Sequence, residues 1–433
     1  MTNDVILTDD VPEISKEALM KNGALDGVKV VDLSSVVVGP VATQTLADYG
    51  ADVIKVESPA GDLLRTLGGK SRSGQLAPKF LHFNRNKRSI ALDLKSEAGM
   101  AALRRLIETA DVVVTNMRPA ALKRLGLDGE TLLAGNPGLI MCRLVGFGQQ
   151  GRYRDRPAYD SIIQGVSGVA ATFAQSGNAP RFVPMTIADH IVGIIAAQMM
   201  LMALFHRERT GEGQLIDVPM FENMVAFVMS EHMGQQSYVP PRGPFGDSRL
   251  LDPRAQPIAT KDGYISIAAN TDSQAFALFD AMGMSELKED PQLNSVAARY
   301  RNVSEYFAVR EQGLRQKTTA EWMEILTACD VPAAPCHSFE TLLDDGHLAD
   351  IGMFRAVENA DEGDIIDIAV PNSSTVGPRR DWRSAPLKGE HSREILREIG
   401  YTDHDIAAMA LAGAVIDGAR KGDIGAPVAA TSQ

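Results

Sequence analysis

The sequence has 433 residues, 45% of them hydrophobic and 23% charged, which is the composition of a globular protein long enough for two or three domains. Its net charge of −12 argues against a nucleic-acid partner, because phosphate backbones are bound by basic surfaces. The three cysteines are widely spaced, which excludes a disulfide framework and fits a reducing compartment.

Residues 1–24 are polar and unpatterned, and we expect them to form a poorly ordered extension. Their acidic beginning lacks the basic and apolar regions of a signal peptide. The longest apolar stretch, from Ile191 to Phe205, is too short to span a bilayer. We therefore expect a cytoplasmic protein without a membrane span.

Residues 25–220 alternate between strand and helix patterns. The strand patterns lie at 28–34, 51–57, 111–116 and 139–147, and the helical patterns lie at 41–50, 96–110 and 119–126. Such alternation predicts a parallel sheet covered by helices, with right-handed crossovers. The sequence therefore predicts an α/β large domain with a Rossmann-like parallel sheet.

The rest of the chain predicts a second domain and its connections. Prolines and glycines at 221–256 indicate a linker, and residues 257–335 indicate a smaller α+β domain. The acidic segment 336–385 is expected to be an irregular return linker. Residues 386–433 carry two short helical patterns, which we expect to pack on the large domain.

One segment reverses the acidic balance of the chain. Thirteen lysines and arginines, but only four acids, occur from Arg65 to Arg124. A basic segment in an acidic protein suits a small polyphosphate ligand. The alternative is a solvated face that is balanced by acidic segments elsewhere, and charge alone favours this alternative.

Two common kinds of site are not predicted. The segment GFGQQG, residues 146–151, matches a dinucleotide fingerprint, but RYRDRP follows where a helix would have to begin. A nicotinamide or flavin site is therefore not expected. No HExxH pattern occurs in the sequence, and no metal site is predicted.

Five blocks occur in a characteristic order, namely GPVATQTLADYGADVIKVE, FNRNKRSIALDL, ADVVVTNMRPAALKRLGL, DRPAYDSIIQGVSG and IADHIVGIIAAQMMLMALFHRERTGEGQLIDVPM. Together with the terminal KGEHSREILREIGY, they resemble the CaiB/BaiF family (class III) of CoA-transferases. The resemblance implies an enzyme that moves CoA from an acyl-CoA donor to a carboxylic acid acceptor. It implies no tightly bound cofactor beyond the CoA thioester substrate, and a homodimer of interlocked chains.

The resemblance also places the nucleotide end of coenzyme A. The family's basic and polar contact positions correspond to Arg65, Lys87, Arg88, Asn116 and Arg124. These residue types suit a pyrophosphate and a 3′-phosphate, because a guanidinium group binds pairs of phosphate oxygens and an ammonium group supplies a point charge.

Asp189, in IADHIVG, matches the family's nucleophile, which precedes a long apolar helix. The resemblance implies that its carboxylate forms an anhydride and then an aspartyl-CoA thioester. We expect the helix N-terminus to keep the carboxylate ionised at neutral pH, and nearby backbone N–H groups to stabilise the oxyanions. An N-cap role for this aspartate is the structural alternative.

Tyr159 and Asp160 stand where the related α-methylacyl-CoA racemases carry a His-Asp pair. Tyrosine is a poor base, since its unperturbed pKa is about 10, so a transferase is favoured. Asp160 is expected to orient a substrate or to cap a helix. A 2-methylacyl-CoA racemase and a non-catalytic CoA-binding protein are the alternatives. Val37 and Pro157 replace the glutamine and lysine of formyl-CoA transferases, which argues against formyl or oxalyl substrates.

Overall fold

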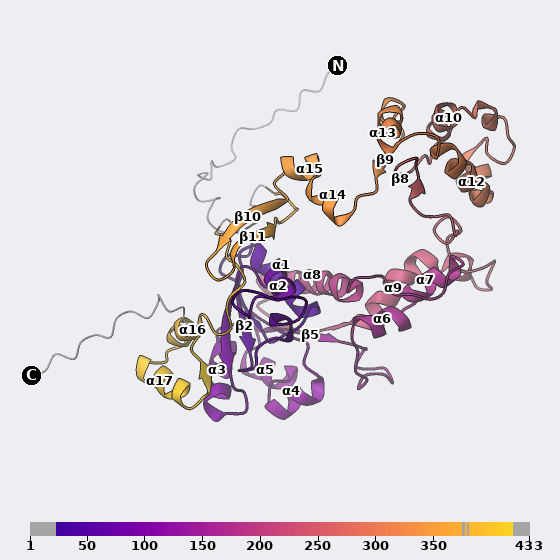
Figure 1. The fold of residues 1–433 in the computed structure, drawn as a ribbon. Coiled ribbons are helices and arrows are strands. Elements are labelled where there is room, and N and C mark those ends of the chain that lie inside the picture. Colours follow the sequence, from indigo (N-terminus) through magenta and orange to yellow (C-terminus); the bar gives the residue numbers. More distant parts are fainter. Residues whose placement is uncertain (1–22, 375–376, 379–380, 419–433) are drawn as a thin grey trace, which may run out of the picture. The chain divides into compact units, whose positions relative to one another are not determined.

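The computed structural model describes residues 23–374, 377–378 and 381–418 (Figure 1). The chain divides into two compact units. Of the described residues, unit 1 comprises those in 23–160, 186–223 and 352–418, and unit 2 comprises 161–185 and 224–351. The predicted N-terminal extension lies almost wholly outside the described residues, as does the end of the predicted C-terminal segment.

Unit 1 is built on a seven-stranded sheet of order β12-β3-β2-β1-β4-β5-β6. Its strands are β1 (Lys29–Asp32), β2 (Asp52–Glu57), β3 (Lys87–Leu92), β4 (Val112–Thr115), β5 (Ile140–Val145), β6 (Gln214–Pro219) and β12 (Val415–Ile416). The first six strands pair in parallel, and only β12 is antiparallel to its neighbour β3. The order 3-2-1-4-5-6 is that of the Rossmann fold, which confirms the predicted α/β class.

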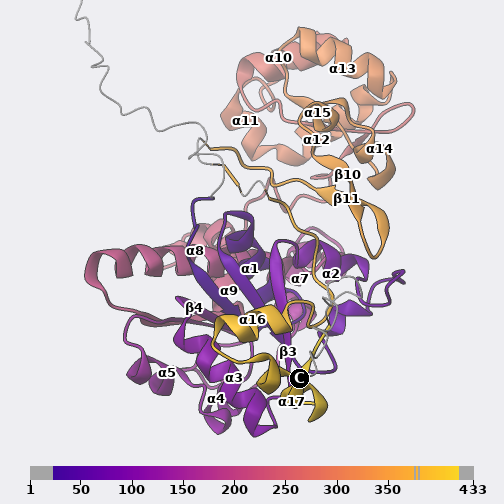
Figure 2. The same ribbon diagram turned by 90° about the vertical axis from the view of Figure 1, so that its left-hand side faces the viewer.

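Helices cover the sheet of unit 1, and all four residues of β4 are buried, as expected for a central parallel strand. The helices are α1 (Val38–Asp48), α2 (Pro78–Phe83), α3 (Glu97–Glu108), α4 (Pro119–Leu125), α5 (Gly129–Gly135), α8 (Ile187–Thr210), α16 (Ser392–Glu398) and α17 (Asp403–Leu411). Figure 2 shows α16 and α17 near α3 and β3. Ile395, Leu396 and Ile406 of these two helices join the same apolar core as Leu103 and Leu106 of α3.

Helix α8 packs tightly against α1 because Gly193 has no side chain. A Cβ atom at this position would lie 2.8 Å from the carbonyl oxygen of Val38 and 3.0 Å from the Val41 side chain. Among the described residues, α8 is the helix whose length and composition would allow it to cross a membrane, which by itself is weak evidence for a span. Its residues Val192 and Met200 are buried in unit 1, as in the core helix of a globular protein.

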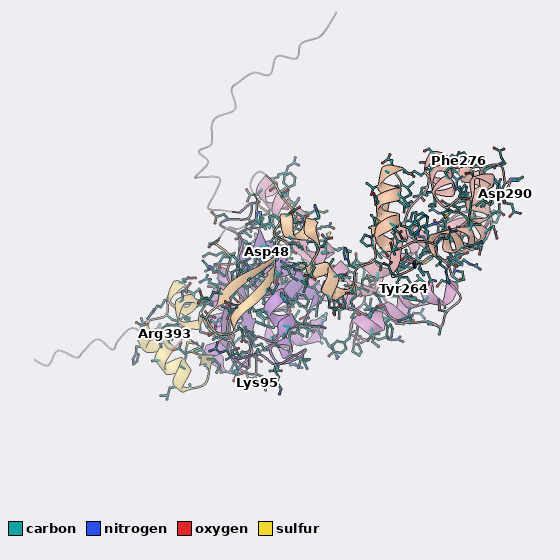
Figure 3. The ribbon with its side chains drawn as sticks, turned by 45° about the horizontal axis from the view of Figure 1, so that its top comes forward. Asp48, Lys95, Tyr264, Phe276, Asp290 and Arg393 are labelled. Atoms are coloured by element: carbon teal, nitrogen blue, oxygen red, sulfur yellow. The ribbon has the colours of Figure 1, made fainter. Side chains whose placement is uncertain are left out.

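Unit 2 combines helices with a three-stranded antiparallel sheet of order β7-β8-β9. Trp322 is fully buried at its centre and donates a hydrogen bond from Nε1 to the carbonyl oxygen of Leu314 at 2.7 Å. Figure 3 labels Tyr264, Phe276 and Asp290 in this unit. It contains α7 (Val169–Gln175), β7 (Ile258–Ala259), β8 (Tyr264–Ile267), α10 (Asp272–Ala281), α11 (Val296–Arg301), α12 (Val303–Leu314), α13 (Thr319–Ala328), β9 (Ala333–Pro335), α14 (Phe339–Leu343) and α15 (Gly346–Asp350). Helices α6 (Asp160–Val166) and α9 (Met220–His232) begin in unit 1 and continue into unit 2.

The prediction that residues 336–385 are irregular is wrong. This segment contains α14, α15 and a hairpin of β10 (Phe354–Asn359) and β11 (Gly363–Ile368). The hairpin is held in unit 1 by Arg85, which forms ion pairs with Asp48 of α1 and Asp367 of β11. Figure 3 labels Asp48, one of the two acidic partners of Arg85. Likewise, α9 occupies the start of the predicted linker 221–256. The homodimer and the other domain boundaries stay predictions.

Candidate active site

The candidate site lies where the order of the sheet changes direction, between β1 and β4. In doubly wound sheets the connections after two such strands leave toward opposite sides and open a crevice at their carboxyl ends. Residues 35–38 follow β1 and residues 116–120 follow β4, and both segments line a cavity of about 520 Å³. Its wall is completed by residues 144–146, Gln149, residues 154–159, Asp189 and Met220. The fold therefore brings Asp189, Tyr159 and Asn116 to one cavity.

Asp189 is buried near the start of α8, with 9% of its surface exposed. The helix begins at Ile187 after the N-cap Thr186, so Asp189 is its third residue. The structural alternative, in which Asp189 is the N-cap, is therefore wrong. Within the described part of the chain, no hydrogen bond to the Asp189 carboxyl group is seen, and this group remains available to a ligand in the cavity.

The side chain of Asp160, rather than that of the N-cap residue Thr186, accepts hydrogen bonds from the start of α8. Its Oδ1 accepts hydrogen bonds from the backbone N–H groups of Ala188 at 2.8 Å and Asp189 at 3.1 Å. A carboxylate is a favourable partner for the unpaired N–H groups of a helix N-terminus. Because both N–H groups are already occupied, they do not serve as the oxyanion donors that we expected beside Asp189.

The ionisation of Asp189 differs from the prediction. Burial raises the pKa of its carboxyl group to about 7, the nearby charge of Asp160 contributes to this rise, and Lys79 opposes it. The backbone N–H groups of Ala188 and Asp189 donate to Asp160, so they do not donate to the Asp189 carboxylate. The protonated and ionised forms of Asp189 are therefore both well populated at neutral pH.

A different helix offers free backbone donors at this cavity. Helix α1 begins at Val38, and its N-cap Val37 makes no side-chain capping bond. Among the described residues, no acceptor is seen for the N–H groups of Val38 and Gly39, although both residues are buried. Buried N–H groups are rarely left unpaired. Val38 lines the cavity and Gly39 follows it in the first turn of α1, so their N–H groups are candidates for binding an oxyanion.

Three of the predicted CoA contacts are engaged in ion pairs away from this cavity. The Arg65 guanidinium pairs with Glu57 at 2.6 Å, and Lys87 is fully buried with its Nζ 3.3 Å from Asp32. Arg88 pairs with Asp52, Glu394 and Glu398 at 2.6 to 2.8 Å. None of the three lines the cavity around Asp189. All three are buried, so they do not form the solvated face that was the alternative, and their contact with CoA stays a prediction.

The other predicted residues lie at or near the cavity. Asn116 connects its two walls, because its amide accepts from the Ser35 N–H at 3.1 Å and donates to the Ser35 carbonyl at 2.9 Å. Tyr159 lines the cavity and is 74% exposed. Arg124 is exposed in the last turn of α4, the helix whose first residues line the cavity.

Three further arginines line the cavity and were not singled out in the sequence. Arg118 is the N-cap residue of α4, and Arg154 and Arg156 follow β5. The Arg156 guanidinium lies 3.9 Å from the ring centre of Tyr153, a cation–π distance that orients it. Arg154 and Arg156 stand in RYRDRP, the segment that argued against a dinucleotide site. Their position after a strand of a parallel sheet was the signal that could have identified them.

Comparisons with known proteins agree with this geometry. Residues 25–392 match the model of CoA-transferase family III. The chain is 35% identical over 387 residues to a succinate–glutarate CoA-transferase of Agrobacterium fabrum, covering 87% of this chain and 95% of that protein. It is 33% identical over 396 residues to a succinyl-CoA–D-citramalate CoA-transferase of Chloroflexus aurantiacus, covering 89% and 96%.

A solved structure of a CaiB/BaiF family protein from Brucella suis is also similar. It has a TM-score of 0.75 and 34% sequence identity, and the match covers 88% of this chain and 100% of that one. The fold and the cavity define an α/β enzyme, and the chain belongs to CoA-transferase family III. The predicted family and enzyme class are therefore confirmed. Enzymes of this class use CoA thioesters as substrates.

The raised pKa of Asp189 predicts a pH-dependent cost in stability. Between about pH 4 and pH 7 the aspartate is ionised in the unfolded chain but protonated in the folded one, so its contribution to folding becomes less favourable as pH rises through this window. Asp189→Asn removes this cost. We expect the free energy of unfolding of the variant, relative to wild type, to increase by about 1.4 kcal/mol per pH unit within this window and then level off. Urea unfolding measures it, and a difference that does not change with pH would contradict the burial effect.

Proposed function

We propose that the enzyme transfers CoA from an acyl-CoA donor to a carboxylic acid acceptor through covalent intermediates on Asp189. The observation that carries this proposal is a buried carboxyl group without a hydrogen-bond donor in the described residues, placed in the cavity at the switch point of the sheet. A carboxylate is a weak nucleophile in water but an effective one when it is desolvated and aimed.

The chemistry proceeds in four steps. The Asp189 carboxylate attacks the donor thioester, forming a mixed anhydride and releasing CoA thiolate. The thiolate attacks the aspartyl carbonyl of the anhydride, which gives an aspartyl-CoA thioester and frees the donor acid as its carboxylate. The acceptor carboxylate then attacks this thioester and again releases thiolate. Finally, the thiolate attacks the acceptor carbonyl of the second anhydride, forming the new acyl-CoA and regenerating the Asp189 carboxylate.

Each step passes through a tetrahedral oxyanion that needs hydrogen-bond donors. We assign this role to the N–H groups of Val38 and Gly39, since the first turn of α1 leaves them without acceptors among the described residues. The close contact at Gly193 supports this assignment, because it brings α8 against the start of α1 one helical turn after Asp189. We assign to Tyr159 and Asp160 the positioning of the substrate and of α8, respectively.

We place the phosphates of CoA near α4. Arg118, Arg124 and Asn116 stand at or beside one end of the cavity, and two of them carry exposed guanidinium groups. Guanidinium groups hold phosphate oxygens in pairs. Contact of CoA with Arg65, Lys87 and Arg88 stays a prediction, and their buried ion pairs favour a role in holding the loops of the site.

We propose a short dicarboxylic acid as the acceptor. The two relatives named above are, by name, transferases for succinate and glutarate and for succinyl-CoA and D-citramalate. In this chain, Val37 and Val38 provide an apolar wall, and Arg154 and Arg156, with Asp155 between them, leave a net positive charge in the same cavity. One carboxylate of the acceptor reacts at Asp189, and the second carboxylate binds these arginines.

The nucleophile is tested by Asp189→Asn, which keeps nearly the same shape but removes the attacking oxygen anion. Transfer of CoA from succinyl-CoA to glutarate, measured by mass spectrometry of the thioesters, is expected to fall by several orders of magnitude while CoA binding persists. Glu208→Gln changes an exposed acid at the far end of the same helix and serves as the matched control with wild-type activity. Substantial transfer by the Asn variant, after its intact mass has excluded deamidation, would contradict the mechanism.

The two groups of arginines predict opposite kinetic effects. Arg124→Ala is expected to raise the KM for acyl-CoA with a loss of about 1.5–3 kcal/mol, typical of a hydrogen bond to a charged group, and to change the acceptor KM little. Arg156→Ala is expected to raise the acceptor KM instead. Steady-state kinetics with both substrates varied makes each variant the control for the other. Equal effects on both substrates would show that these residues are structural.

A further inference from the structure

Unit 2 contains a second cavity, which is separate in sequence from the active site. Its volume is about 630 Å³, within the range of small-molecule sites. One wall is formed by α11 and α12, and another by residues 266–270 at the end of β8 and in the loop after it. The segment 249–257 borders it as well. All lining residues belong to unit 2.

Arg310 of α12 is the unusual residue of this cavity. It is only 8% exposed, yet within the described residues its guanidinium forms no ion pair with a carboxylate. Its Nη2 donates to the carbonyl oxygen of Ile267 at 2.8 Å, whereas its buried Nε has no hydrogen-bond partner. Burial lowers the pKa of this guanidinium, as expected for a charge without compensation. A buried cation of this kind is costly unless an anion pairs with it.

The aromatic residues around Arg310 hold it in place. Its guanidinium carbon lies 5.2 Å from the ring centre of Tyr306 and 5.1 Å from that of Phe307. The Tyr306 hydroxyl in turn donates to the carbonyl oxygen of Ala269 at 2.7 Å. A flexible cation on a surface would have none of these constraints. The donor is therefore preorganised at the cavity wall, which lowers the entropic cost of binding a ligand.

The other three arginines of the cavity already have acidic partners. Arg299 pairs with Asp272 at 2.7 Å, and Arg249 pairs with Asp247 at 2.6 Å. Arg254 lies 3.9 Å from Glu311 and donates to Ser304 Oγ. Among the arginines that line this cavity, Arg310 is therefore the one that has no carboxylate partner within the described residues. The cavity thus has a fixed excess of positive charge at one position.

We propose that this cavity binds a small organic anion, with its carboxylate or phosphate on Arg310 and its body against the apolar wall. We expect an organic ligand because an inorganic ion would fill only a small part of the cavity volume of about 630 Å³. Val296, Tyr300 and Leu250 are each about half exposed and offer it apolar and aromatic surface. Guanidinium groups recognise carboxylate and phosphate oxygens alike, so the two anionic groups are separated by experiment.

The test uses the full-length enzyme with ADP, benzoate and inorganic phosphate as probes, each titrated by calorimetry. We expect ADP or benzoate to bind, and Arg310→Gln to weaken that binding at least tenfold. Binding of ADP identifies a phosphate ligand, and binding of benzoate identifies a carboxylate. Arg249→Gln, at an arginine already paired with Asp247, is the control and should bind like wild type. Because ADP could occupy the CoA site, Arg124→Ala is titrated as well and should retain the binding that depends on Arg310.

Other outcomes overturn the proposal. Probe binding that is lost in Arg124→Ala but kept in Arg310→Gln would place the ligand in the active site. Inorganic phosphate that binds as tightly as ADP would exclude an organic ligand. Failure of all three probes, together with a smaller oligomer for Arg310→Gln in sedimentation, would make the cavity a subunit contact. If Arg310→Gln does not fold, Tyr300→Ala replaces it. This variant should weaken ADP or benzoate but not inorganic phosphate, and unchanged binding of all probes would reject the site.

Discussion

The hydrogen bonds from the backbone N–H groups of Ala188 and Asp189 to Asp160 are the contact on which the proposed active site depends. They hold the start of α8 in place without a local cap, and they put a second acid beside Asp189. Because those N–H groups are occupied, the helix does little to stabilise the Asp189 carboxylate, and burial raises its pKa to about 7. At neutral pH a substantial fraction of the Asp189 carboxyl groups is then ionised, and no hydrogen bond from the described residues holds the carboxylate. Both properties suit the proposed nucleophile, which must form a covalent bond and be regenerated in each turnover.

A set of buried ion pairs supports the loops on which this arrangement rests. Lys55 pairs with Asp62 at 2.9 Å, and the Asp62 carboxylate accepts from the Val36 N–H at 3.1 Å in the loop after β1. Lys87 and Asp32 lie deeper in the same region. Removing one member of such a pair leaves a buried charge uncompensated, which is strongly destabilising. Through Asp62, the buried Lys55 therefore supports the loop of Val36, which lines the cavity, although Lys55 does not line it.

The sequence predicts the local structure of unit 1 well and its long-range polar contacts poorly. Runs such as VVVT define parallel strands by apolar content alone, and the order of strands and helices then implies the Rossmann-like sheet. Arg88, by contrast, pairs with Glu398, 310 residues away, and no local pattern reveals such a partner. The same holds for Asp160, whose capped helix begins more than 25 residues later. The sequence of the β10–β11 hairpin resembles a polar linker, because each strand carries two charged residues and one face of the hairpin is exposed.

The central claim is that Asp189 becomes covalently bonded during turnover, and trapping of the intermediate tests it most directly. The enzyme is incubated with succinyl-CoA, quenched with hydroxylamine, digested and mapped by tandem mass spectrometry. The mechanism predicts one hydroxamate, at Asp189 in the segment PMTIADHIVG, that requires acyl-CoA and is absent from Asp189→Asn. A hydroxamate at another carboxyl group, or rapid transfer with no modified carboxyl group at all, would contradict it.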